Sequence, residues 1–151
     1  MSAEKIDRKI SVIFATDVVD YSLHMEKDES GTVTSLRKYE KILKEAFKKH
    51  GGRLFNTGGD SFMAEFSSAV KAVECAIDFQ NIVKEKNIKP SLSFRIGINA
   101  GDVILEKKNL LGDGVNVAAR LEQLSQPNGI TISKSIFDYI EGKLDLKIQD
   151  L

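Results

Sequence analysis

Residues 56–64, NTGGDSFMA, decide the fold of this chain. Their central part, 57–60, is a hairpin signal, because glycine and aspartate are favoured in the tight turns that join antiparallel strands. Residues 53–56 and 62–66 are then the two strands of this hairpin. A hairpin between two helical segments is typical of the middle of a βαββαβ unit.

Apolar periodicity predicts the elements on either side of the hairpin. Residues 10–15 (ISVIFA) form a short, largely apolar run, which indicates a strand that is buried on both faces. Apolar side chains recur at three- and four-residue steps over 32–50, which predicts an amphipathic helix. A second helix, capped by Ser67 or Ser68, is predicted to extend to about residue 86.

The rest of the chain is predicted to add strands at 92–98, 103–105, 130–133 and 144–148, and helices at 112–124 and 134–140. The fold class is therefore α+β, with a ferredoxin-like βαββαβ core and additional C-terminal α/β elements. We expect a single domain over residues 1–151, in which residues 1–8 form a flexible leader.

The composition excludes several classes of partner. The chain has 22 Lys and Arg against 22 Asp and Glu, so no overall field draws it to nucleic acid or to a membrane. No apolar run reaches the roughly 18 residues that a membrane span needs. The single cysteine, Cys75, lies in a predicted apolar helix stripe, where a buried thiol is expected. These features predict a cytoplasmic protein.

Two carboxylates are expected to meet at one edge of the sheet. In a βαββαβ sheet the first and third strands are adjacent and antiparallel, so Asp17, just past the first strand, and Asp60, just before the third, should lie side by side. Two Mg²⁺ or Mn²⁺ ions would relieve their repulsion, and Gly58 and Gly59 would let the backbone approach a phosphate. The alternative is that both aspartates are ordinary turn residues.

Asn116 and Arg120 are candidates for binding a ribose and a phosphate. They are four residues apart, so they share one face of a helix, and the forked guanidinium suits phosphate oxygens. The alternative is a solvated helix face. Arg95 is a second candidate phosphate ligand, because a charge in a mostly apolar strand needs a partner or faces a cleft.

Four segments together resemble the catalytic domain of class III adenylate and guanylate cyclases, most closely the bacterial type. They are 14–19 (FATDVV), 56–64 (NTGGDSFMA), 94–101 (FRIGINAG) and 110–121 (LLGDGVNVAARL). The resemblance extends from about residue 9 to the end, although related domains usually continue further with a lysine-bearing segment. It implies conversion of ATP, or possibly GTP, to a cyclic 3′,5′-nucleotide and pyrophosphate.

The resemblance also implies how the site is built. Asp17, Asp60 and the carbonyl of Val18 would hold two Mg²⁺ or Mn²⁺ ions. The family works as a head-to-tail homodimer with shared active sites, in which the aspartates of one chain face the Asn and Arg of the other.

Three side chains would then act on the nucleotide. Asn116 would orient the ribose, Arg120 would stabilise charge on the α-phosphate, and Arg95 would hold the terminal phosphates.

The residues that should select the base depart from the family pattern. Adenylate cyclases usually carry Lys at the position of Asn56 and Asp or Thr at the position of Asn109, whereas guanylate cyclases carry Glu and Cys. An amide both donates and accepts, so either purine could be bound and the choice between ATP and GTP stays open.

Two other functions are compatible with the sequence. One is a cyclase-like domain of weak or no activity that serves as a dimerisation or nucleotide-sensing module, which Asn56, Asn109 and the short C-terminal end favour. The other is a diguanylate cyclase, which the Gly58-Gly59-Asp60 turn suggests but which leaves Asn116 and Arg120 without a role.

Overall fold

The structure is a computed structural model that describes residues 6–150. Its elements follow one another as β1 (Asp7–Val18), α1 (Tyr21–Lys27), α2 (Glu29–His50), β2 (Arg53–Gly58), β3 (Ser61–Phe66), α3 (Ala69–Glu85), β4 (Phe94–Glu106), β5 (Asn109–Leu111), α4 (Asp113–Leu124), β6 (Ile130–Ile132) and α5 (Lys134–Ile140). The α+β class and the βαββαβ order of the core are confirmed.

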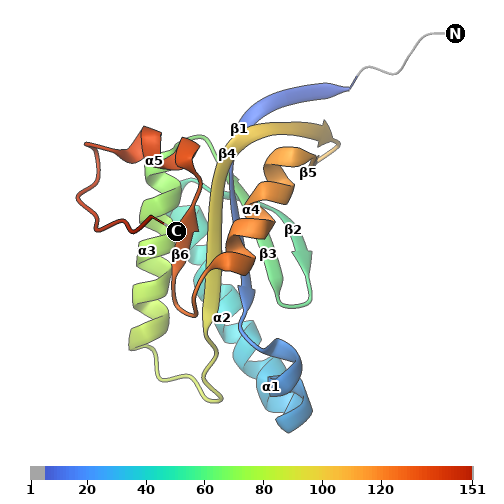
Figure 1. The fold of residues 1–151 in the computed structure, drawn as a ribbon. Coiled ribbons are helices and arrows are strands. Elements are labelled where there is room, and N and C mark those ends of the chain that lie inside the picture. The colour runs from blue at the N-terminus through green and yellow to red at the C-terminus, as the bar shows by residue number, and fades with distance from the viewer. Residues whose placement is uncertain (1–5, 151) are drawn as a thin grey trace, which may run out of the picture.

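One mixed sheet runs through the molecule (Figure 1). Its strand order is β2-β3-β1-β4-β5, and β6 pairs with β4 in parallel whereas the other pairs are antiparallel. The first and third strands of the chain are therefore adjacent and antiparallel, as predicted. This pairing brings the end of β1 to the start of β3.

The sheet buries both of its faces against helices. The predicted burial is confirmed for residues 11–15 of β1 and extends to Thr16, but it is wrong for Ile10, which is 68% exposed. Val12 and Phe14 point to the larger core, which α2 and α3 cover, whereas Ile13 and Ala15 point to a smaller core under α4. In Figure 1, α4 lies in front of the sheet and α2 lies behind it.

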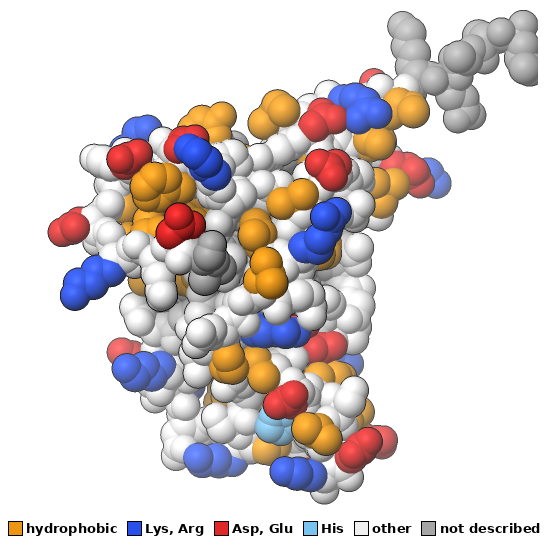
Figure 2. Space-filling view, in the orientation of Figure 1, with side chains coloured by type: hydrophobic (Ala, Val, Ile, Leu, Met, Phe, Trp, Pro, Cys, Tyr) orange, Lys and Arg blue, Asp and Glu red, His pale blue; other side chains and the backbone are white. Residues whose placement is uncertain are grey.

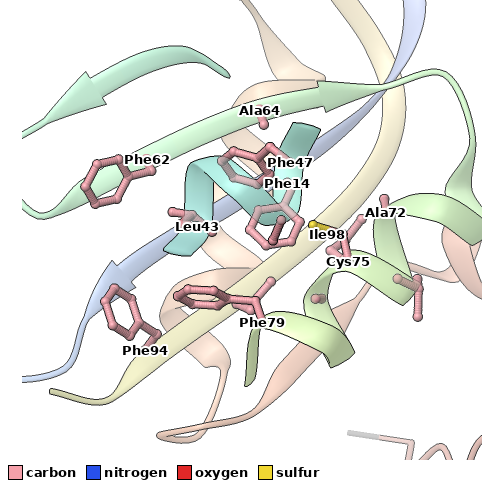
Figure 3. Close-up of a cluster of buried hydrophobic side chains, with 14 of the residues drawn as sticks. Phe14, Leu43, Phe47, Phe62, Ala64, Ala72, Cys75, Phe79, Phe94 and Ile98 are labelled. Carbon is pink, nitrogen blue, oxygen red and sulfur yellow. The ribbon is translucent and has the colours of Figure 1, made fainter. Parts of the chain in front are cut away.

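Aromatic side chains fill the larger core (Figure 3). Phe14 meets Phe47 of α2 edge to face, with ring centroids 5.1 Å apart, and Phe79 of α3 meets Phe94 at the same distance. Fully burying one such side chain stabilises the fold by about 1.5–3 kcal/mol. Cys75 is buried in this core, as predicted, and burial raises the pKa of its thiol to about 12.

Local capping explains where α2 begins and ends and where α3 begins. Asp28 accepts a hydrogen bond from Gly31 N at the start of α2, and Gly51, with a φ of 80°, ends that helix. Ser68 rather than Ser67 caps α3, because its side chain accepts from Lys71 N. None of the helices within residues 6–150 is long and apolar enough to cross a membrane.

The prediction of two separate strands at 92–98 and 103–105, joined by a turn, is wrong. A single strand, β4, continues from Phe94 to Glu106. The reason is its partner, because β1 pairs with β4 without interruption from Asp7 to Val18. Gly101, a turn residue by local preference, pairs with Ser11 inside this ladder.

Several boundaries also differ from expectation. Residues 144–148 form no strand, because nothing in the described sheet pairs with them. Asp7 and Arg8 belong to β1 and are therefore not part of a flexible leader, which was predicted for residues 1–8. Residues 1–5 of that predicted leader lie outside the described residues. The short helix α1 and the short strand β5 were not predicted.

Candidate active site

The residues that carry the two predicted carboxylates lie where the end of β1 approaches the turn between β2 and β3. Asp17 is the penultimate residue of β1 rather than a residue beyond it, and Asp60 lies between β2 and β3. The backbone N–H of Val18 donates to Asp60 Oδ2 at 3.2 Å. Asp60 is therefore held against the residue that follows Asp17.

The electrostatics of this edge match a carboxylate pair. Burial raises the pKa of Asp60, the hydrogen bond from Val18 N opposes that rise, and the negative charge of Asp17 adds to it. The net pKa of Asp60 is above its ordinary value. Burial and the charge of Asp17 thus disfavour the ionised form of Asp60, and a bound cation would offset that cost.

Asp17 has a direct partner on the neighbouring strand. Asp17 and Arg95 are opposite residues in the β1–β4 ladder. Arg95 Nε donates to Asp17 Oδ1 at 3.1 Å, and Arg95 Nη2 donates to Asp17 Oδ2 at 2.8 Å. This bidentate ion pair raises the pKa of Arg95 and explains how a charged side chain is tolerated in a mostly apolar strand.

The end of α4 covers this ion pair with two side chains that the sequence analysis did not single out. Gln123 Nε2 donates to Asp17 Oδ2, and Gln123 Oε1 accepts from Arg95 Nη2, each at 3.3 Å. The carboxylate of Glu122 lies 3.7 Å from Arg95 Nη2 and is only 4% exposed. Burial, followed by the charge of Asp17, raises the pKa of Glu122 to about 8.

A signal for Glu122 is present in the sequence. Val115, Ala118 and Glu122 recur at helical spacing and all three are buried, so a carboxyl group occupies a position that the apolar stripe of α4 should fill. A buried acid at such a position requires nearby partners, which are Gln123, whose Nε2 donates to Glu122 Oε2, and the guanidinium of Arg95 at 3.7 Å.

A glycine explains how closely α4 approaches the sheet. A Cβ atom at Gly97 of β4 would collide with the backbone of Ala118 and Glu122. Asn99, also on β4, donates from Nδ2 to the carbonyl oxygen of Gly114 at 3.0 Å and ties down the first turn of α4. These contacts hold Glu122 beside Arg95.

The remaining predicted residues lie on the surface of the single chain. Asn116 and Arg120 are both in α4 and both exposed, on the side of the helix that continues to Gln123. Asn56 is exposed on β2 beside an irregularity in its pairing with β3. Asn109 begins β5, and its Oδ1 accepts from Leu110 N at 2.9 Å.

The turn itself is open. A Cβ atom at Gly58 or Gly59 would meet no atom within 4 Å, so space is available beside Asp60. Gly59 has a φ of 63°, a conformation that favours glycine.

The carboxylates of Asp17 and Asp60 suit a cation whose remaining ligands come from substrate phosphates and water. Within residues 6–150 no group of three or more His, Cys, Asp or Glu side chains could hold a metal ion by itself. Mg²⁺ is commonly bound by one or two carboxylates together with substrate phosphates and water. Asp17 and Asp60 are the two carboxylates that could take part in such a site.

Comparison with known proteins identifies the family. Residues 1–150 match the adenylate and guanylate cyclase catalytic domain. A Rhizobium meliloti (strain 1021) protein named "Putative adenylate cyclase 3" is 41% identical over 155 residues, covering 99% of this chain but 26% of that protein. The chain therefore spans about a quarter of that relative.

Solved structures agree with this relationship. An adenylate/guanylate cyclase/hydrolase from Silicibacter pomeroyi has a TM-score of 0.88 and 32% identity, covering 97% of this chain and 88% of that one. The catalytic core of a rhodopsin-guanylyl cyclase with converted specificity, in complex with ATPαS, has a TM-score of 0.88 and 25% identity, covering 97% and 90%. The chain belongs to the class III adenylate and guanylate cyclase catalytic domain family.

Proposed function

We propose that this chain is a single cyclase catalytic domain that converts ATP, or GTP, to a cyclic 3′,5′-nucleotide and pyrophosphate. The proposal is supported by the bond from Val18 N to Asp60, which holds Asp60 next to the residue after Asp17, and by the charge of Asp17 acting on Asp60, in a member of the cyclase family. We further propose that the domain acts in the cytoplasm.

Asp17, Asp60 and the Val18 carbonyl are proposed to hold two Mg²⁺ or Mn²⁺ ions. Bound there, the ions would lower the pKa of the 3′-hydroxyl and neutralise charge on the phosphates. The 3′-oxygen would attack the α-phosphorus and give its proton to solvent water, while the bond from the α-phosphorus to the pyrophosphate oxygen breaks and pyrophosphate leaves. Gly58 and Gly59 leave space for the phosphates beside Asp60.

Three side chains are proposed to bind the nucleotide itself. Asn116 orients the ribose, and Arg120 stabilises the charge that develops on the α-phosphate. Arg95 holds the terminal phosphates. Because Asn116 and Arg120 are exposed in a single chain, both can reach a nucleotide bound to another chain.

Two copies of the chain are proposed to share each site. A cavity of about 780 Å³ lies near the first half of β1 and α5, lined by Lys9, Arg53 and Tyr139 among others, but neither Asp17 nor Asp60 lines it. The shared site is proposed instead from the exposed positions of Asn116 and Arg120 on α4. Two-fold symmetry would produce two equal sites.

ATP is the substrate that the comparisons favour. The Rhizobium relative is named for adenylate cyclase activity, whereas the guanylyl cyclase core that was solved with an ATP analogue has a converted specificity and does not bear on the choice. Asn56 and Asn109 could each bond either purine, because an amide donates and accepts. GTP is therefore the second substrate to test.

A cyclase-like domain without turnover is the second candidate function. The ion pair of Arg95 with Asp17 favours this candidate, because the pair occupies a proposed metal ligand.

One experiment distinguishes the candidate functions. Purified wild-type protein and Asp17→Ala are each incubated with ATP or GTP and with Mn²⁺ or Mg²⁺, and the products are separated by chromatography. Cyclic AMP or cyclic GMP that disappears in the variant supports the proposal. Metal-dependent binding without product supports the inactive module, and cyclic di-GMP would indicate a diguanylate cyclase.

A further inference from the structure

We propose that the ion pair of Arg95 with Asp17 must break before a cation can bind Asp17, and that Gln123 is the positioning residue that stabilises this pair. The Arg95–Asp17 ion pair is called the latch below. This inference rests on the proposed function, because it takes Asp17 to be a metal ligand. It adds a contact that a cation must break before it binds.

The geometry of the pair is that of a strong interaction rather than a chance surface contact. Both carboxylate oxygens of Asp17 are engaged, at 3.1 and 2.8 Å. The two side chains are 15% and 22% exposed, and they project from opposite positions of paired strands. A bidentate, partly buried guanidinium–carboxylate pair holds its geometry better than a solvated one.

Gln123 closes the arrangement from α4. One amide group bonds both members of the pair, donating to Asp17 Oδ2 and accepting from Arg95 Nη2. The approach of α4 to Gly97 fixes the helix that carries it. Gln123 therefore stabilises the latched arrangement from a residue that is not itself proposed to touch metal or nucleotide.

Glu122 provides a second acceptor for the displaced guanidinium. Its carboxylate lies 3.7 Å from Arg95 Nη2, on the side of Arg95 that α4 covers. A cation that takes Asp17 can thus leave Arg95 beside the carboxyl group of Glu122, whose ionised form the charge of Arg95 favours. The released guanidinium is also available to the triphosphate, so cation and nucleotide should each promote the binding of the other.

The test is a titration with Mn²⁺ alone, without nucleotide, in which free Mn²⁺ is measured by electron paramagnetic resonance. Arg95→Ala removes the latch and should tighten Mn²⁺ binding about tenfold, as loss of a charge-assisted bidentate bond predicts. Gln123→Ala should tighten it by a smaller factor. Arg8→Ala is the matched control, because Arg8 and Asp102 form another Arg–Asp pair between β1 and β4, and it should leave Mn²⁺ affinity unchanged.

Arg95→Lys separates the latch from simple charge repulsion. Lysine keeps the positive charge but cannot form the forked bond, so its Mn²⁺ affinity should lie between those of wild type and Arg95→Ala. Gln123→Ala made in the Arg95→Ala background should have no further effect, since the latch is already gone. Circular dichroism checks that each variant is folded.

Some outcomes would overturn the latch. Equal Mn²⁺ affinity in wild type, Arg95→Ala and Gln123→Ala does so, as does Arg95→Lys binding like wild type while Arg95→Ala binds tightly. If the latch fails while wild type still makes a cyclic nucleotide, the proposed function stands. If Mn²⁺ binds more tightly to Arg95→Ala but the wild type makes no cyclic nucleotide, the latch stands and the cyclase proposal falls.

Discussion

The backbone N–H of Val18 donates to the carboxylate of Asp60, 3.2 Å away, and this bond joins the end of β1 to the turn between β2 and β3. It connects two segments far apart in sequence at the point where the candidate site lies. The position of Asp60 therefore depends on the pairing of β1 with β3, which is itself a consequence of the βαββαβ order.

Asp60→Asn should abolish cyclase activity while preserving the fold. The amide can still accept from Val18 N, but the charge that would hold a cation is lost, and we expect a fall of at least about a hundredfold in kcat. Because burial raises the pKa of Asp60, the ionised acid is disfavoured in the fold, and the neutral variant should unfold at an equal or higher temperature. Turnover near the wild-type rate would exclude a metal role for Asp60.

Gly97→Ala should destabilise the protein. The added methyl group would collide with the backbone of Ala118 and Glu122, which cannot move as a side-chain end could. We expect a loss of about 1–3 kcal/mol in the free energy of unfolding, measured by denaturant titration. Gly58→Ala is the control for stability, because its methyl group meets open space. Equal unfolding midpoints for both variants would contradict the close packing of α4 on β4.

Asp78→Asn should remove part of the stability that the protein has at neutral pH. The hydrogen bond with His50 is the main cause of the lowered pKa of Asp78. A carboxyl group whose pKa is depressed by folding contributes stability above its unfolded pKa of 3.8, and this is lost as the pH falls through the folded value.

The difference between wild type and Asp78→Asn is therefore pH-dependent. It should be about 0.5–1 kcal/mol at pH 6, discounted for the partial exposure of the pair. Denaturant titrations at several pH values down to about pH 3 should show the two unfolding free energies converging. A constant difference over that range would mean that Asp78 acts through packing rather than charge.

Much of the core could be predicted because its signals are local and repeated. The apolar run of β1, the amphipathic pattern of α2 and the glycine turn before Asp60 each identify an element from neighbouring residues alone. The βαββαβ order then places Asp17 and Asp60 together without knowledge of any contact.

The errors arise where a distant partner overrides a local preference. Gly101 and Asp102 favour a turn, but the unbroken ladder with β1 keeps them extended. The alternation of residues 144–148 favours a strand, but no described strand pairs with them. The contact of Gln123 with Asp17 joins residues 106 positions apart, so no pattern in the sequence predicts it.

The surface of the domain gives no overall electrostatic preference for a partner. On the face in Figure 2, basic and acidic side chains are interspersed, as the equal numbers of the two charges led us to expect. The proposed recognition of an anionic nucleotide would then depend on particular side chains, such as those proposed for it, Arg120 and Arg95.

The most direct test of the shared carboxylate site is to mix Asp17→Ala with Arg120→Ala. Each variant alone should make no cyclic nucleotide, because every site in its homodimer lacks one required side chain. An equal mixture should recover about a quarter of the wild-type rate, since half of the dimers are mixed and each contains one intact site. Recovery at that level is expected if two chains share each active site. A mixture that forms dimers but is as inactive as its components would contradict the shared site.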